Sequence, residues 1–160
     1  MLTFFPRTLP VSIGYTKIRA MSLKVKKIVL VVDDSRDVRS FIRALLISGL
    51  PEYALEVLTQ PSSDTALQRI EEKNGNIDLI STNIHRPGMD GYGFIRKVKH
   101  KYPHIKILIC SAHAKRGELE QMSDSGLVDG YIAKPLTEKE YLNRVKNILD
   151  TLNIVRLNFS

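Results

Sequence analysis

The chain has 160 residues, a formal net charge of +7 and a hydrophobic fraction of 43%. That length is typical of one domain, which buries a core without disulfides or a metal. The single cysteine, Cys110, excludes an intramolecular disulfide framework and a zinc site built from several cysteines. No apolar run approaches the roughly 18 residues that cross a bilayer, and 26% charged residues argue against disorder. The composition therefore indicates a soluble, intracellular globular domain.

Much of the positive charge lies at the start of the chain. Residues 1–32 hold six of the 24 basic residues and none of the 17 acidic ones, so the remainder is close to neutral. This distribution argues against a DNA-reading surface. We expect residues 1–24 to be a disordered basic leader, or to precede a true translation start at Met21, with a transit peptide as the alternative.

The first half of the chain alternates between short apolar runs and amphipathic segments. Residues 28–32 form an uninterrupted aliphatic run, which is typical of a strand buried on both faces. Apolar side chains at helical spacing then predict a helix over 35–47, which Gly49 is expected to stop. A short strand over 55–58 follows, and then a helix capped by the serine pair at 62–63.

The second half repeats this order. After a turn at 74–76, strands are expected over 77–84, 105–110 and 131–133, and helices over 91–102, 116–124 and 137–152. Five strands that alternate with five helices predict an α/β fold, a single doubly wound (βα)5 domain with helices on both faces of a parallel sheet. We expect this domain to span 25–152, with a short C-terminal tail over 153–160.

Polar side chains lie at the ends of four of the predicted strands, at the edge where the carboxyl ends of parallel strands meet. They are Asp33, Asp34, Asn83, Ser111 and Lys134. Two close carboxylates are costly to keep ionised without a counter-charge, which Mg²⁺ or the Lys134 ammonium would supply. Taken alone, Asp33 and Asp34 are better explained as the cap and first-turn charge of the following helix. The coincidence of four strand ends favours a functional site.

Over about residues 26–149 the chain resembles the receiver domain of two-component response regulators. The matching motifs are the family's acidic pair, the segment around its phospho-accepting aspartate, its switch hydroxyl, and its aromatic residue, lysine and proline. In this sequence they are Val31-Val32-Asp33-Asp34-Ser35, the stretch from Asp78 to Gly91 with its Pro87-Gly88-Met89-Asp90-Gly91 turn, Ser111-Ala112, and Tyr131-Ile132-Ala133-Lys134-Pro135. The ordered set is highly specific, although no single motif would be.

The resemblance implies a flavodoxin-like sheet in the order 2-1-3-4-5 and a non-enzymatic, cytoplasmic role in phosphorelay signal transduction. It assigns the metal position to Asp33, Asp34 and Asn83, with a backbone carbonyl after Asn83 as a further ligand for Mg²⁺. The switch positions fall on Ser111 and Tyr131.

The same resemblance places Lys134 at the phosphoryl contact. Pro87 belongs to the turn after the acceptor position, and Pro135 follows a peptide bond that is expected to be cis.

Asn83 departs from the family's pattern, which has an aspartate at the phospho-accepting position. A neutral amide oxygen is a far poorer nucleophile than a carboxylate, and its adduct would not be an acyl phosphate. One negative charge is also lost, so we expect weaker Mg²⁺ binding and a Lys134 ammonium paired with Asp33 or Asp34. The sequence therefore predicts a pseudo-receiver. An engineered replacement in an otherwise ordinary receiver is the alternative.

Protein contact is the expected mode of action. Because only about ten residues follow the last predicted helix, fewer than a recognition motif needs, the sequence favours a single-domain regulator. Its expected surface is the fourth helix, fifth strand and last helix, and its expected partners are a sensor kinase, a phosphotransfer protein or a signalling target. Neither nucleic acid nor membrane is expected. The basic run at 96–101 is interpreted as a solvated helix face, with an acidic partner or nucleic acid as alternatives.

An enzyme is the second hypothesis, namely a Mg²⁺-dependent phosphatase or hydrolase on the same fold with Asp33 as nucleophile. Such enzymes use Asp-x-Asp spacing, whereas Asp33 and Asp34 are adjacent. A flavin carrier would need a Ser/Thr/Gly-rich phosphate cradle that the first loop lacks, so no organic cofactor is expected. We interpret Arg86 as a solvated loop residue, His85 as weak evidence for a metal, and Cys110 as a small core side chain.

Overall fold

The computed structural model describes residues 24–85, 90–112 and 116–157. Five strands and five helices alternate along this part of the chain. Their bounds are Val25–Val32 (β1), Arg36–Gly49 (α1), Tyr53–Gln60 (β2), Ser63–Glu72 (α2), Leu79–Thr82 (β3), Gly91–Lys101 (α3), Lys106–Ser111 (β4), Arg116–Asp124 (α4), Gly130–Ala133 (β5) and Glu138–Leu157 (α5).

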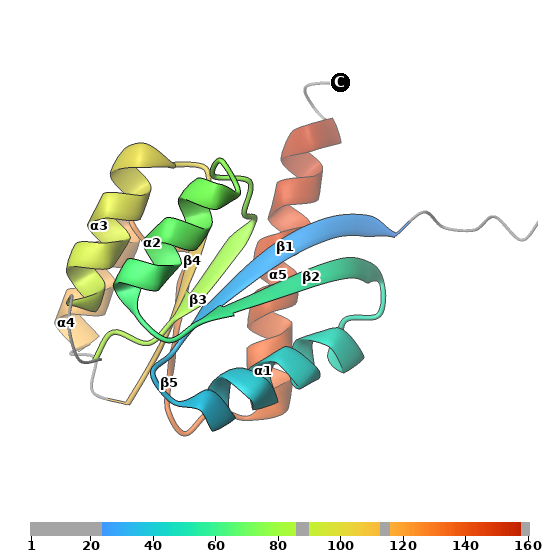
Figure 1. Ribbon diagram of the computed structural model, residues 1–160, viewed down its shortest axis with the longest axis horizontal. Helices are drawn as coiled ribbons and strands as arrows, with labels where there is room; N and C mark the ends of the chain where they lie inside the picture. The colour runs from blue at the N-terminus through green and yellow to red at the C-terminus, as the bar shows by residue number, and fades with distance from the viewer. Residues whose placement is uncertain (1–23, 86–89, 113–115, 158–160) are drawn as a thin grey trace, which may run out of the picture.

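The strands form one parallel sheet in the order β2-β1-β3-β4-β5, which confirms the predicted fold and strand order. Helices α2, α3 and α4 lie at one face of the sheet, and α1 and α5 lie at the other (Figure 1). With both faces covered, each strand must be apolar on both sides, which explains the uninterrupted aliphatic runs in the sequence.

Alternate residues of each strand enter two separate cores. In β1, Leu30 and Val32 pack beneath α2, α3 and α4, whereas Val29 and Val31 pack beneath α1 and α5. Successive side chains of a strand point to opposite faces, so a one-residue shift in register would exchange the two cores. The register is therefore strongly specified, and it fixes which residues reach the carboxyl edge.

The predicted boundaries differ from the observed ones mainly at strand ends. β1 begins at Val25 rather than at residue 28, because its ladder with β2 pairs Val25 with Tyr53 at its start. Lys27 thus lies inside a strand and is fully buried, with its ammonium 3.7 Å from the carboxylate of Asp78. β3 is only Leu79–Thr82, half the predicted length.

The last helix is longer than expected and ends at Leu157 rather than at residue 152. Its inner face contributes Tyr141, Val145, Ile148 and Leu149 to the core, as the spacing of apolar residues indicated. Within the described residues, each helix is too short or too polar to cross a bilayer.

Two local features position the loops at the carboxyl edge. Ser35 caps α1, and its hydroxyl accepts a hydrogen bond from the amide of Val38 at 3.4 Å. Gly91 begins α3 directly against the backbone of Ile84, where an added Cβ would lie 2.6 Å from the Ile84 Cα. Only glycine permits this close approach, so the start of α3 is fixed beside the end of β3.

Candidate functional site

The candidate site lies at the carboxyl edge of the sheet, where strand pairing aligns the ends of β1, β3, β4 and β5. The Asn83 amide donates to the Val32 carbonyl at 3.0 Å, which ties the residue after β3 to the end of β1. On the other side, the Lys134 amide donates to the Ser111 carbonyl at 3.1 Å. We call Asp33, Asn83, Ser111 and Lys134 together the rim.

Asp33 provides the buried carboxylate of the rim, with 4% of its surface exposed. Its Oδ2 accepts from the Lys134 ammonium at 3.0 Å, and its Oδ1 accepts from the backbone amide of Ser35 at 2.9 Å. A buried carboxylate needs such partners to stay ionised. Both carboxylate oxygens of Asp33 are therefore bound by the protein itself. Of the two partners expected for Lys134, Asp33 and Asp34, the structure pairs it with Asp33.

Asp34 differs from its neighbour because its side chain is exposed to solvent. Its backbone carbonyl, with that of Asp33, accepts from the guanidinium of Arg39, at 3.1 and 2.7 Å respectively. Arg39 lies one turn into α1 and holds the acidic loop through the backbone rather than through the carboxylates. The sequence reasoning missed this residue; a basic side chain one turn after an acidic pair was the available signal.

Asn83 is half-buried at the end of β3. Its side-chain nitrogen donates to the backbone carbonyl of His85 at 3.3 Å. The backbone carbonyl of Asn83 accepts from the Thr82 hydroxyl at 3.1 Å. An aspartate in this place has no donor when ionised, so the contact with His85 depends on the amide. His85 itself is exposed.

The remaining predicted site residues lie around the rim at different depths. Ser111 is buried at the end of β4, whereas Tyr131 is half-buried and packs against the core beneath α2, α3 and α4. The peptide bond between Lys134 and Pro135 is cis. Pro87 and its neighbour Arg86 lie outside the described residues.

A metal site at the rim would draw on carboxylate oxygens. Within the part of the chain that the structure describes, no three His, Cys, Asp or Glu side chains are clustered so that they could hold a metal ion. Asp33 of the rim and the adjacent Asp34 are the candidate carboxylates, and Mg²⁺ is commonly held by one or two carboxylates with waters. Their oxygens fit that ion in chemistry, but one of the two carboxylates already carries two protein donors.

A buried polar chain lies behind the rim, between the sheet and α5. The Tyr141 hydroxyl donates to Ser81 Oγ at 2.9 Å, and Ser81 Oγ lies 3.7 Å from Cys110 Sγ. Burial raises the pKa of Cys110 to about 11 and raises that of Tyr141 as well. Both groups therefore stay protonated at neutral pH. Cys110 is 2% exposed and belongs to the core beneath α1 and α5, which confirms the predicted core placement.

Comparison with known proteins gives one consistent family. A model of the response regulator receiver domain matches residues 29–146. The heme response regulator HssR of Staphylococcus aureus strain MRSA252 is 30% identical over 125 residues, which are 78% of this chain and 52% of that protein. This chain thus spans about half the length of the curated relatives it matches.

Solved structures give the same fold. A response regulator receiver domain protein from Clostridium thermocellum has a TM-score of 0.71 at 25% identity, covering 81% of this chain and 98% of that one. The chemotaxis protein CheY4 of Vibrio cholerae has a TM-score of 0.66 at 22% identity, covering 78% and 99%. At the latter identity the likeness concerns the fold alone.

Proposed function

Since this chain belongs to the family of response regulator receiver domains, we propose that it is a receiver whose state is not set by conventional aspartyl phosphorylation. Receiver domains act in two-component systems, where they interact with sensor kinases and other proteins. In our proposal Asn83 occupies the phospho-accepting position, and the rim is held in one arrangement by its own side chains. Such a receiver would act in the cytoplasm, as a protein-binding module.

The observation that carries the proposal is the hydrogen bond from the side-chain nitrogen of Asn83 to the backbone carbonyl of His85 at 3.3 Å. An amide lacks the anionic oxygen that attacks phosphorus, so the usual acyl phosphate does not form. The side-chain nitrogen also donates to the backbone carbonyl oxygen of His85, two residues after Asn83. A backbone carbonyl in this segment is one of the ligands that the family uses for its metal. Asn83 thus disfavours both attack of its own side chain on phosphorus and the binding of Mg²⁺ beside it.

The ion pair between Lys134 and Asp33 supports the same conclusion. Lys134 holds Asp33 Oδ2 at 3.0 Å and neutralises the one buried carboxylate at the rim. Receiver domains typically bind Mg²⁺ at their phosphorylation site, where the ion supplies positive charge for phosphoryl transfer. Here Asp33 and Asp34 would hold it, and we expect weak affinity because Lys134 competes for Asp33.

Without a phosphoryl group, a partner must supply the differential interaction that shifts the domain between states. We propose that partners contact the surface of α4, β5 and α5, where Tyr131 lies half-buried beside the rim. The relevant partners are a sensor kinase, a phosphotransfer protein or a signalling target. No observation at the rim favours the hydrolase alternative, since the carboxylate of Asp33 is engaged by two donors.

The proposal is tested with acetyl phosphate and Mg²⁺, followed by intact-mass measurement. We expect the natural chain to gain no phosphoryl group. The matched control is Asn83→Asp, which restores a carboxylate of nearly equal size and which we expect to gain one. A phosphoryl adduct on the natural chain would overturn the proposal. Failure of Asn83→Asp to accept a phosphoryl group would show that Asn83 is not what limits the reaction.

A further inference from the structure

Two hollows flank α3 on the face of the sheet that α2, α3 and α4 cover. The first lies between α3 and α4 and has a volume of about 460 Å³. The second lies between α2 and α3 and has a volume of about 520 Å³. Neither hollow is part of the rim, because no rim residue lines either of them.

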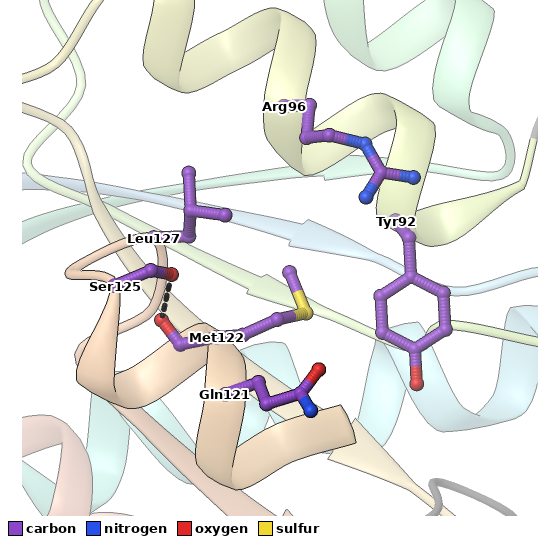
Figure 2. A pocket seen from close by; sticks show the side chains of 6 residues that line it. All are labelled: Tyr92, Arg96, Gln121, Met122, Ser125 and Leu127. Carbon is purple, nitrogen blue, oxygen red and sulfur yellow. Dashed lines mark hydrogen bonds between the residues drawn. The ribbon is translucent and has the colours of Figure 1, made fainter. Parts of the chain in front are cut away.

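The hollow between α3 and α4 combines an apolar floor with polar walls. Figure 2 shows the side chains of Tyr92 and Arg96 on one side and those of Gln121 and Met122 on the other, converging on the space between the helices. Met122 is buried and Leu127 is half-buried, so an apolar group entering here would displace water from hydrophobic surface.

The hollow between α2 and α3 has a similar floor and a more strongly basic edge. Leu67, Val98 and Tyr102 supply its apolar surface. Its edge carries four basic side chains and one acid: Arg96, Lys97, His100, Lys101 and Glu71. Glu71 is already paired with Lys101 at 2.7 Å.

Positive charge lies between the two hollows, and within the part of the chain that the structure describes it has no ion-pair partner. Arg96 lines both of them. Among the described residues, the ion pairs of α3 are those of Lys99 with Asp129 and of Lys101 with Glu71, and none involves Arg96 or Lys97. The latter two are exposed on the outer surface of the helix. A guanidinium in this setting is suited to a carboxylate, which it binds through two parallel hydrogen bonds.

We propose that the α2–α3–α4 surface is a docking site for an acidic segment of a partner protein. A carboxylate of the segment pairs with Arg96, and apolar side chains on either side of it enter the two hollows. Aromatic or aliphatic anchors beside a buried charge pair are the usual source of affinity at such interfaces. This surface shares α4 with the α4–β5–α5 surface but centres on α3, and the proposal does not depend on the chemistry of Asn83.

A protein segment fits this surface better than nucleic acid does. Phosphate binding needs cations along a continuous track, often with aromatic rings on which bases stack. Here the cations alternate with apolar hollows, and the acid Glu71 lies at the edge of one of them. The arrangement therefore complements carboxylates interspersed with apolar side chains.

The test is selection of peptides from a random display library against the natural full chain, followed by fluorescence anisotropy of the enriched peptides. We expect enriched peptides to carry Asp or Glu beside Leu, Phe or Trp. We expect Arg96→Glu to weaken their binding by about tenfold or more, because a charge pair becomes a repulsion. Lys97→Glu provides a second variant with the same direction of effect.

Arg43→Glu is the matched control, since Arg43 is also exposed and lies on α1 at the opposite face. It makes the same change in charge and should leave binding unchanged, while thermal unfolding checks that each variant is folded. The proposal is overturned if no peptide is enriched, if enriched peptides lack acids, or if Arg43→Glu weakens binding as much as Arg96→Glu. Tighter binding of a DNA or RNA oligonucleotide at physiological salt would overturn it in favour of nucleic acid.

Discussion

The two ends of the sheet each carry a lysine–aspartate pair, but the pairs differ in what surrounds them. At the carboxyl end, Lys134 meets Asp33 at 3.0 Å, and the lysine side chain is 23% exposed. At the amino end, Lys27 meets Asp78 at 3.7 Å, and the lysine side chain is fully buried. Both carboxylates are largely buried, so the pairs differ at the lysine: the Lys134 side chain reaches solvent, whereas that of Lys27 is enclosed by the fold.

Asp78 is also bound to the backbone on both sides. Its Oδ2 accepts from the Ile28 amide at 2.8 Å, and its backbone carbonyl accepts from the Lys106 amide at 3.1 Å. It thus connects β1 to β4 at the start of β3. The comparison teaches that the same two residue types make an enclosed structural clamp at one end and a pair with a partly exposed lysine at the other.

The largest effect is expected when the amino-end pair is broken. Asp78→Ala leaves the Lys27 ammonium buried without its carboxylate, which should lower the free energy of unfolding by about 3–5 kcal/mol. Urea denaturation measures this loss. Adding Lys27→Met to Asp78→Ala should recover part of it, because an apolar pair carries no buried charge. A loss for Asp78→Ala smaller than that for Lys134→Met would contradict the comparison.

Gly91 sharpens the comparison at the carboxyl end, since it fixes α3 beside β3. Gly91→Ala places a methyl group 2.6 Å from the Ile84 backbone and should cost about 1–3 kcal/mol of stability. Gly93→Ala is the matched control. It meets nothing within 4 Å and should stabilise the helix by about 0.5–1 kcal/mol. Thermal or urea unfolding measures the stability of both variants. Equal effects of Gly91→Ala and Gly93→Ala would contradict the close packing of Gly91 against Ile84.

Breaking the rim pair should cost less and should change metal binding. Lys134→Met should lower stability by only about 1–2 kcal/mol, because Asp33 keeps the hydrogen bond from the Ser35 amide. Removing the competing ammonium should tighten Mg²⁺ binding by roughly tenfold, as measured by calorimetric titration. Lys139→Met removes an exposed lysine of α5 and serves as the control. Unchanged Mg²⁺ affinity in Lys134→Met would argue against competition for Asp33.

The smallest effect concerns the outer part of the amino end. The hydrogen bond from the Tyr53 hydroxyl and the Lys146 ammonium together hold the pKa of Asp150 below its usual 3.8, while burial and Asp150 raise the pKa of Tyr53 to about 12. The carboxylate therefore stabilises the fold above about pH 3.8, and this contribution disappears as the pH falls through the lowered pKa. The phenol contributes below pH 10.0 and loses its contribution as the pH rises toward 12.

Tyr53→Phe removes this hydrogen bond and should lower stability by about 1 kcal/mol near neutral pH. It should also flatten the loss of stability at both the acid and the alkaline end, which denaturation at a series of pH values measures. Lys146 stays close to Asp150, at 3.1 Å, so part of the acid dependence persists. An unchanged pH profile would show that the tyrosine does not couple to the carboxylate.

Sequence patterns could predict the fold and the location of the rim for a simple physical reason. A strand buried on both faces must be apolar throughout, so the first polar residue after each run marks the carboxyl edge. Asp33, Ser111 and Lys134 fit this rule, whereas Asn83 follows two buried polar residues of β3, Ser81 and Thr82. Their contacts could not be predicted, because the distance between Lys134 and Asp33 depends on a packing arrangement across 101 residues of chain.

The sequence did not predict residues that lie in an environment unusual for their type. The first strand was expected over 28–32, which left Lys27 outside it, and lysines are seldom fully buried. Its burial follows from Asp78, a residue 51 positions later that supplies the counter-charge. Arg39 was missed because its partners are backbone carbonyls, so its position after the acidic pair was the one available signal.

The most direct test of the proposed rim is its response to a phosphoryl donor. Two-dimensional amide NMR of the natural chain in Mg²⁺, before and after acetyl phosphate, reports on Ser111, Tyr131 and Lys134. If Asn83 blocks phosphorylation and the Lys134–Asp33 pair holds the rim, these signals stay in place, while those of Asn83→Asp move. Movement of the same signals in the natural chain would contradict this view of the molecule.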